Sequence, residues 1–323
     1  MLTYISRRVL YSIPVILVAS FLLFTFVRAT FDPTAKLAGS SHDAHAVARE
    51  RKFLGLDKPL VVQYGDWLSK FVKGDWGKSE HTHESTYSVI TRALGYTVQL
   101  IIWGILLSAV ISISIGVYSA VRQYSALDYT FTGISFVGLA MPPFWFGLIA
   151  IQFLAVGPKD WFHLNEPIFS FVGLHGTDKS GINLDYFRHL ALPVLTLTVQ
   201  IIASWSRYQR ASMLDVMSSD YIRTARAKGV PQRSVILKHG LRNALIPLVT
   251  VMALDIGALF GGLIITEKIF SIPGMGRVFI DSLTAGDATV LVAWTIVTAM
   301  FIVAFNLIAD LAYGLLDPRI RLS

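Results

Sequence analysis

A few residues in this sequence could carry chemistry, but none of them completes a catalytic or metal site. The segment GDWGKS at residues 74–79 is similar to the end of a phosphate-binding loop, which needs a glycine five residues before Gly77, where this chain has Val72. Two histidine pairs have the spacing of metal ligands, but such histidines in a polar segment are usually solvated. They are His42 with His45 and His81 with His83. Cysteine is absent, which excludes disulfides, thiolate metal sites and a cysteine nucleophile. We therefore expect no catalytic residue, no metal site and no cofactor bound by this chain.

One acidic residue has an unusual setting. Asp255 lies within the apolar run 245–266. A carboxylate inside a membrane is costly and is a candidate functional group for that reason. It could face water near a passing cationic substrate, or its charge could be satisfied by a neighbouring helix. We favour the second interpretation.

The segment 220–247 concentrates basic residues in a chain that is otherwise mostly apolar. These are Arg223, Arg226, Lys228, Arg233, Lys238 and Arg242. Residues 220–228 are predicted to form a short helix with Asp220 as its N-cap and Gly229 at its end. Pro231 prevents simple continuation, and a second helical run is predicted from Ser234 to Ala244. Small residues between the charges (Ala225, Ala227 and Gly229) would let another protein approach closely.

Composition indicates a membrane protein. The chain has 323 residues, 54% of them hydrophobic and only 15% charged, whereas about a quarter of a globular domain is charged. Its net charge of +7 gathers beside apolar runs, which is typical of cytoplasmic loops rather than of nucleic-acid binding. Six apolar runs are about long enough to span the hydrocarbon core. They are residues 9–27, 96–117, 129–156, 189–206, 245–266 and 290–315.

The predicted fold is therefore an all-α polytopic membrane protein with six transmembrane helices. We divide it into the N-terminus and first helix (1–28), an external insert (29–94), a five-helix core (95–317) and a cytoplasmic tail (318–323). The core contains a cytoplasmic loop, 207–243. Basic residues outside the runs place both termini in the cytoplasm. Small residues in the second run predict close helix packing, and they are Gly104, Ser108, Ser112, Ser114 and Gly116.

Particular segments of this chain resemble a known family. YIRTARAKG at 221–229, followed by HGLRNALIP at 239–247, is similar to the cytoplasmic coupling loop of permease subunits of dipeptide/oligopeptide binding-protein-dependent ABC importers. LGLDKPL at 54–60 and FSIPGMG at 270–276, which follows Glu267, resemble external segments of the same family. The chain also departs from the wider importer signature. Arg223 and Thr224 replace its Glu and first Ala, and His239 and Arg242 stand where Ile and Pro would be, whereas Ala225, Gly229 and Leu241 match.

The resemblance implies a bacterial cytoplasmic (inner) membrane complex of two permease subunits, two cytoplasmic ATPases and an external solute-binding protein. ATP and Mg would be bound by the ATPases, the solute would be a peptide, and membrane lipid would surround the helices. It also implies contacts with the ATPases through Tyr221, Ile222, Arg223, Thr224, Ala225, Arg226, Ala227, Lys228, Gly229, His239 and Leu241. Pro142, Pro143 and Asp255 are candidates for the translocation path; the prolines could instead form a packing kink.

Two alternatives remain at this point. One is a self-sufficient secondary transporter, a class that often shows repeated halves around ionisable groups at the membrane midplane. Only Asp255 and Asp310 are predicted well inside apolar runs, and the sequence shows no repeated halves. The other is an importer of the same class that carries nickel, glutathione or another small solute.

Overall fold

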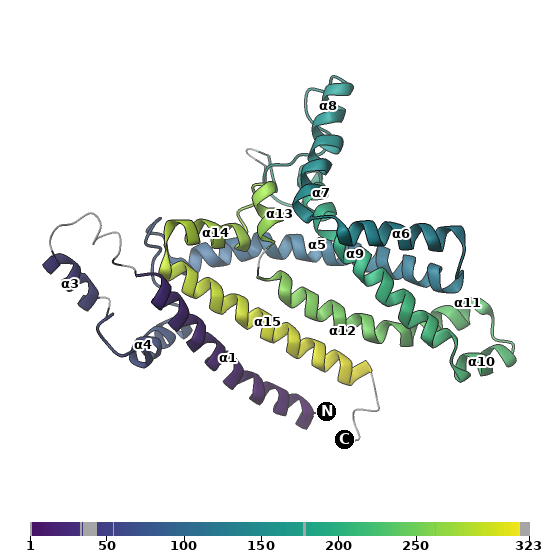
Figure 1. The fold of residues 1–323 in the computed structure, drawn as a ribbon, viewed down its shortest axis with the longest axis horizontal. Helices are drawn as coiled ribbons and strands as arrows, with labels where there is room; N and C mark the ends of the chain where they lie inside the picture. The colour runs from purple at the N-terminus through teal and green to yellow at the C-terminus, as the bar shows by residue number, and fades with distance from the viewer. Residues whose placement is uncertain are drawn as a thin grey trace.

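Long helices run side by side along the longest axis of the molecule (Figure 1). The computed structural model describes residues 2–32, 34, 44–53, 55–176, 179–261 and 263–316. Within these residues the chain forms helices and loops and no strand, with a single isolated bridge between Lys78 and Ser85. The predicted all-α fold is confirmed. His42 and the tail 318–323 lie outside the described residues.

The helices follow one another in a simple order along the chain. Their bounds are α1 (Leu2–Thr30), α3 (Ala44–Phe53), α4 (Leu60–Val72), α5 (Thr86–Val121), α6 (Ala126–Ala140), α7 (Pro143–Ala150), η1 (Ile151–Val156), α8 (Gly157–Trp161), α9 (Leu184–Met217), α10 (Asp220–Ala227), α11 (Gln232–Ser234), η2 (Val235–Leu241), α12 (Arg242–Leu259), α13 (Ile264–Ile269), α14 (Met275–Ala285) and α15 (Ala288–Leu316). The two segments labelled η are wide, π-helical turns.

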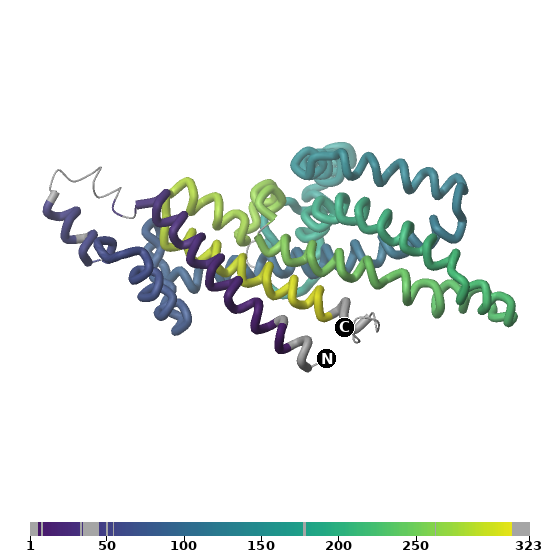
Figure 2. Tube along the Cα trace, turned by 60° about the horizontal axis from the view of Figure 1, so that its bottom comes forward, coloured from purple at the N-terminus to yellow at the C-terminus, as the bar shows by residue number. Residues whose placement is uncertain are grey.

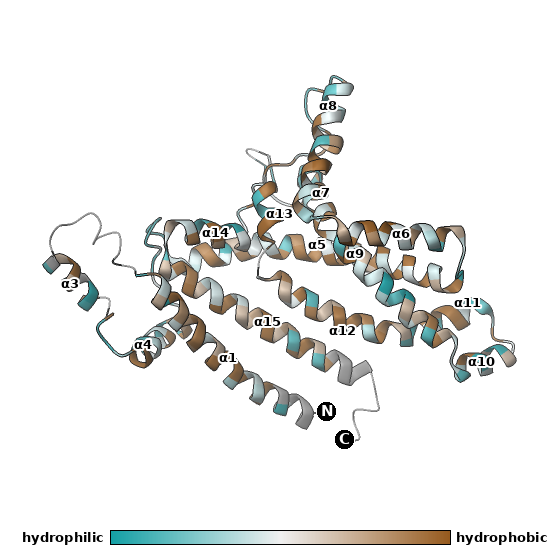
Figure 3. Cartoon of the chain, in the orientation of Figure 1, coloured by the Kyte–Doolittle hydropathy of each residue, from teal (hydrophilic) through white to brown (hydrophobic). Residues whose placement is uncertain are grey.

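Five stretches of the described chain are long and apolar enough to cross a membrane. They are Val9–Thr30, Thr86–Val121, Leu184–Met217, Gln232–Leu259 and Ala288–Leu311. Apolar residues run along these helices, whereas hydrophilic ones gather on α10 (Figure 3). The chain is therefore a multi-pass membrane protein, as predicted.

The third predicted span, 129–156, is not one kinked helix. The chain turns by 106° between α6 and the segment Pro143–Trp161, so this pair makes a sixth span only if both parts are counted together. A residue that precedes proline avoids the helical region, and Met141 and Pro142 both do so, with ψ angles of 120° and 134°. The tandem prolines therefore end α6 and start α7. From α9, Gln200 Nε2 donates to the Met141 carbonyl at 3.0 Å and so satisfies an acceptor at the break.

Two other predicted boundaries differ from the structure. The second spanning helix, α5, begins at Thr86 rather than near Tyr96, so it extends into the predicted external insert. The fourth, α9, continues to Met217. The first part of the predicted loop 207–243 is therefore helical. Both helices continue beyond their apolar runs into polar sequence. A helix satisfies its own backbone hydrogen bonds, so it does not have to end where the apolar run ends.

The long helix α9 lies at the centre of the packing. It contacts α5, α6, α7, α12 and α13, while α1 packs along α15 and α15 packs along α12 (Figures 1 and 2). Four of the five small residues named for α5, Gly104, Ser108, Ser112 and Gly116, are buried as predicted. Ser114 is exposed instead, and its hydroxyl donates to the Val110 carbonyl of the same helix at 2.7 Å. A Cβ atom on Gly116 would lie 2.9 Å from the Ser206 carbonyl oxygen of α9. Small residues let helices approach this closely in lipid, where apolar side chains alone give little drive for association.

The short helix α13, which lies between α14 and α7 (Figure 1), carries Glu267, which forms a buried polar contact. Its side chain is fully buried, and it accepts hydrogen bonds from Thr97 Oγ1 at 2.6 Å and from the backbone N–H of Arg277 at 3.0 Å. Thr97 in turn accepts from the backbone N–H of Met275 at 2.8 Å. Glu267 and Thr97 thus satisfy free amides in the first turn of α14. Burial raises the pKa of Glu267 above its ordinary value, and these hydrogen bonds oppose the shift.

The PGMG segment, residues 273–276, has glycines because Glu267 and its helix approach so closely. A Cβ atom on Gly274 would collide with the Glu267 carboxylate, and one on Gly276 would collide with the backbone of Ile264. This explains in physical terms why a glutamate and a Pro-Gly-x-Gly element occur together.

We predict that Glu267→Ala destabilises the protein by about 1–3 kcal/mol, because it leaves the Thr97 hydroxyl and the Arg277 amide without their acceptor. The melting temperature of the detergent-solubilised protein measures the loss. Glu84→Ala is the control, since the Glu84–Arg92 ion pair is about half exposed on both sides and such pairs contribute about 0–1 kcal/mol. Equal melting temperatures for the two variants would contradict the prediction.

Candidate functional site

The basic helix α10 forms as predicted, with a difference at its start. Ser219, not Asp220, occupies the N-cap position, and Asp220 lies in the first turn, where its charge suits the helix dipole. At the other end, Gly229 has a φ angle of +74°, as expected for the residue after a C-cap. Gly229 N–H donates to the Arg226 carbonyl at 3.0 Å and Val230 N–H donates to the Ala225 carbonyl at 3.2 Å. This pair of hydrogen bonds is the Schellman motif.

One side of α10 packs on the helix bundle, and the other side is exposed. Ile222 is fully buried, and the Tyr221 hydroxyl accepts a hydrogen bond from Asn243 Nδ2 of α12 at 3.0 Å. Most of the other side chains of α10 and its C-cap are exposed, and they are Arg223, Thr224, Arg226, Ala227 and Lys228. Ala225 is half-buried. The helix therefore presents a basic surface at one end of the molecule (Figure 1).

The structure separates His239 and Leu241 from the exposed side of α10. Both lie on η2, and both are partly buried. Leu241 lines a pocket of about 350 Å³ together with Tyr118 and Arg122 at the end of α5. His239 and Leu241 thus lie between α10 and the rest of the bundle, because η2 contacts α9, α10 and α12.

The candidate pathway residues lie elsewhere. The prolines Pro142 and Pro143 join α6 to α7, away from α10 (Figure 1). Asp255 lies on α12 and is half-buried, and its Oδ2 accepts a hydrogen bond from Trp205 Nε1 of α9 at 2.7 Å. A neighbouring helix thus provides a partner for this carboxylate.

Sequence reasoning missed the contacts that hold α6 on α9. Arg210 donates from Nε and from an Nη atom to both carboxylate oxygens of Asp128, at 2.8 and 2.9 Å. Asp128 is buried and also accepts from the Tyr124 amide at 2.9 Å. Such an ion pair joins residues 82 positions apart, and neither residue carries a local signal of its partner. Within the described residues, no three His, Asp or Glu side chains come together in a way that could hold a metal.

Comparison with known proteins agrees with these features. Residues 112–322 match the family described as "Binding-protein-dependent transport system inner membrane component", and residues 1–101 match the N-terminal part of such membrane components. The chain belongs to this family. It is thus a membrane component of a binding-protein-dependent transport system, and the resemblance drawn from its coupling loop is confirmed.

Relatives are similar to the chain over nearly its whole length. It is 40% identical to the oligopeptide transport system permease protein AppB of Bacillus subtilis, over 99% of this chain and 100% of that protein. It is 36% identical to the dipeptide transport system permease protein DppB of Alkalihalophilus pseudofirmus, over 99% of this chain and 100% of that protein. It is also 35% identical to the glutathione transport system permease protein GsiC of Salmonella choleraesuis, over 99% of both chains.

The anchoring of α10 can be tested directly. We predict that Ile222→Ala loosens α10, because truncating a buried isoleucine costs about 2–5 kcal/mol. Amide hydrogen exchange across residues 221–229 should accelerate at least about tenfold, while exchange in α5 and α9 stays unchanged.

The matched control is Arg226→Ala, which changes an exposed residue of the same helix to a strong helix former. Its exchange should remain within about twofold of the wild type. The same exchange rates in both variants would show that Ile222 does not hold the helix.

Proposed function

We propose that this chain is a transmembrane permease subunit of an ATP-driven peptide importer, forms half of the translocation pathway and couples to cytoplasmic ATPases through α10. The observation that carries this proposal is the exposed basic surface of α10. This helix follows the end of the spanning helix α9 and is held in place by its buried Ile222. A surface built in this way suits docking to another protein. The proposed complex contains a second permease subunit, two ATPases that bind ATP and Mg, and an external solute-binding protein, in a bacterial inner membrane with both termini of this chain in the cytoplasm.

The geometry supports a mechanical role for α10. Only Ser218 and Ser219 separate it from α9, and Ser212 of α9 donates a hydrogen bond to the Ala244 carbonyl of α12 at 2.8 Å. A push on α10 therefore reaches α9 and α12 together. Movement of the ATPases would shift both helices as one body, and the pathway would alternate between outward and inward openings. Solute shifts this equilibrium only through contacts that differ between the two states.

A peptide is the solute that the relatives favour. Oligopeptide and dipeptide permeases are among the similar proteins, and peptides share backbone hydrogen-bonding groups whatever their side chains. The glutathione permease relatives make glutathione, itself a small peptide-like solute, the second candidate. Competition of labelled-peptide uptake by unlabelled dipeptide, oligopeptide or glutathione distinguishes them.

Coupling through α10 predicts a specific phenotype. Gly229→Arg should abolish uptake without preventing membrane insertion, because an arginine disfavours the positive φ angle and adds a bulky charge to the docking surface. A Cβ atom on Gly229 would meet no atom within 4 Å, so the fold itself tolerates the extra volume.

Gly181→Arg is the matched control, since Gly181 also has a positive φ angle and open space around it but lies in the loop before α9. Uptake, surface labelling and co-purification of ATPases are measured for both variants. Uptake at the wild-type rate by an inserted Gly229→Arg protein would refute coupling through α10.

Asp255 offers a test of the pathway. Asp255→Asn keeps an acceptor for the Trp205 indole but removes the negative charge, so the melting temperature should change little. If Asp255 faces passing solute, uptake of lysine-containing peptides should fall roughly threefold while neutral peptides are unaffected. Unchanged uptake of every peptide would make Asp255 a structural partner of Trp205 alone.

A further inference from the structure

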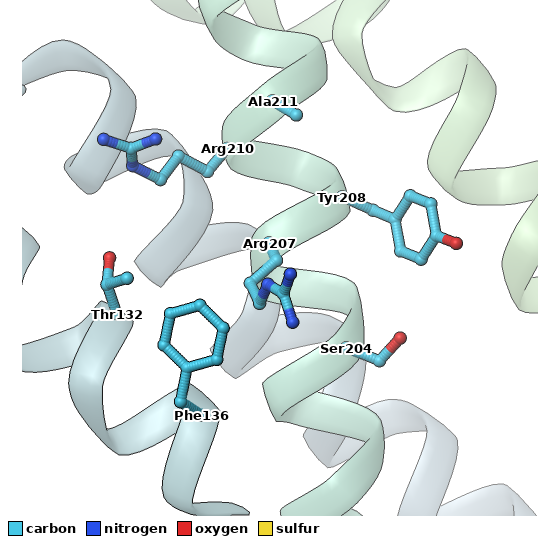
Figure 4. Close-up of a pocket in the computed structure, with 7 residues that line it drawn as sticks. All are labelled: Thr132, Phe136, Ser204, Arg207, Tyr208, Arg210 and Ala211. Carbon is cyan, nitrogen blue, oxygen red and sulfur yellow. The ribbon is translucent and has the colours of Figure 1, made fainter. Parts of the chain in front are cut away.

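An open groove lies between α6 and α9, and of its lining residues only Arg210 has been described above. Its volume is about 620 Å³, and its lining residues are Thr132, Phe136, Ser204, Arg207, Tyr208, Arg210 and Ala211 (Figure 4). Ser204, Arg207 and Ala211 are spaced by three and then four residues along α9 and so share a face of that helix. The groove is thus a continuous surface of the folded chain, with an arginine at its centre.

Arg207 is the unusual member of this groove. Its guanidinium carbon lies 4.7 Å from the centre of the Phe136 ring, a distance at which cation and ring attract each other. Figure 4 shows the two side chains next to each other, while Arg210 points away from them. In the part of the chain that the structure describes, no carboxylate pairs with Arg207, because Asp128 is engaged by Arg210 and no acidic residue lines the groove.

The depth of Arg207 along α9 is informative. Between Arg188 and Arg207 the sequence contains no Asp, Glu, Lys or Arg. These 19 steps correspond to about 28 Å of helix, close to the thickness of a hydrocarbon core, roughly 30 Å. Arg207 therefore lies where hydrocarbon gives way to lipid headgroups, at the membrane face that carries α10. At this depth an exposed guanidinium reaches the headgroup layer, where anionic lipids offer it a counter-charge.

We propose that this groove binds the phosphate of an anionic membrane lipid, with Arg207 as its charged contact. A guanidinium fork matches phosphate oxygens in pairs, and Phe136 restricts the side chain from below. The hydroxyl groups of Thr132 and Ser204 are further donors along the groove. Lipid is favoured over a carboxylate of transported solute, because the groove is open and lies at headgroup depth. The inference does not depend on which solute is transported.

The test uses the whole complex, purified through a tag on this chain and stripped of lipid in detergent. Native mass spectrometry counts the bound lipids while dioleoyl phosphatidylglycerol is titrated, with dioleoyl phosphatidylcholine as the lipid without net charge. Arg207→Gln should weaken phosphatidylglycerol binding about fivefold, the effect of one basic residue near an anionic surface. Binding of phosphatidylcholine should stay unchanged.

The matched control is Arg122→Gln. Arg122 also follows an apolar run and lies 5.8 Å from the Tyr118 ring, but it is outside the α6–α9 groove, so phosphatidylglycerol binding should persist. Arg207→Lys keeps the charge without the fork and should lose about twofold, and it is the variant to measure if Arg207→Gln does not fold.

Three results would overturn the proposal. The first is equal weakening in Arg207→Gln and Arg122→Gln, which would indicate a general electrostatic attraction. The second is phosphatidylglycerol binding that neither Arg207 variant changes. The third is displacement of phosphatidylglycerol by a peptide with a free C-terminal carboxylate but not by its amide, which would assign the groove to transported solute.

Discussion

Polar contacts made by α9 are the interactions on which the rest of the structure depends. Lipid is as apolar as leucine, so helices in a membrane gain little from burying apolar side chains against one another. The chain instead relies on hydrogen bonds that three side chains of α9 donate. Gln200 donates to the Met141 carbonyl, Trp205 to Asp255 and Arg210 to Asp128. Two of these contacts join α9 to the two ends of α6, and the third joins it to α12. On its remaining side α9 packs tightly on the small residues of α5.

This arrangement explains why a short, exposed helix can act on the bundle. An isolated helix of eight residues is not stable in water, and α10 owes its shape to the Schellman motif at its C-terminal end and to one buried side chain, Ile222. Because α9 continues to Met217, α10 begins at the end of the most connected helix. The coupling proposed for α10 would therefore reach several helices through α9 rather than a flexible loop.

A buried carboxylate holds the short helices α13 and α14 in place. Glu267 accepts hydrogen bonds from groups that belong to two other segments, Thr97 and the first turn of α14. Removing one partner of such a network leaves the others buried without water, which costs more than the hydrogen bond itself contributes. The close approach of α13 to Gly274 and Gly276 leaves no room for side chains there. Exposed basic residues thus gather on α10, whereas the carboxylate of Glu267 is buried and joins α13 to α5 and α14.

The sequence by itself determined the class of the protein, its family and the short basic helix that ends at Gly229. These features have local signals, namely long uncharged runs, basic residues beside them and a glycine after a short helix. Such signals are local because contact with lipid or water and the backbone conformation are decided within each segment. It did not reveal that the tandem prolines end α6, that residues 207–217 are helical, or that Asp255 meets Trp205. Those features depend on which helices become neighbours. Tertiary packing also decided that Arg210 is paired while Arg207, on the same helix, has no carboxylate partner among the described residues. Arg207 and Arg210 are the same residue type on the same helix, so the sequence does not distinguish them. Only the position of Asp128 on α6 decides which of the two arginines is paired.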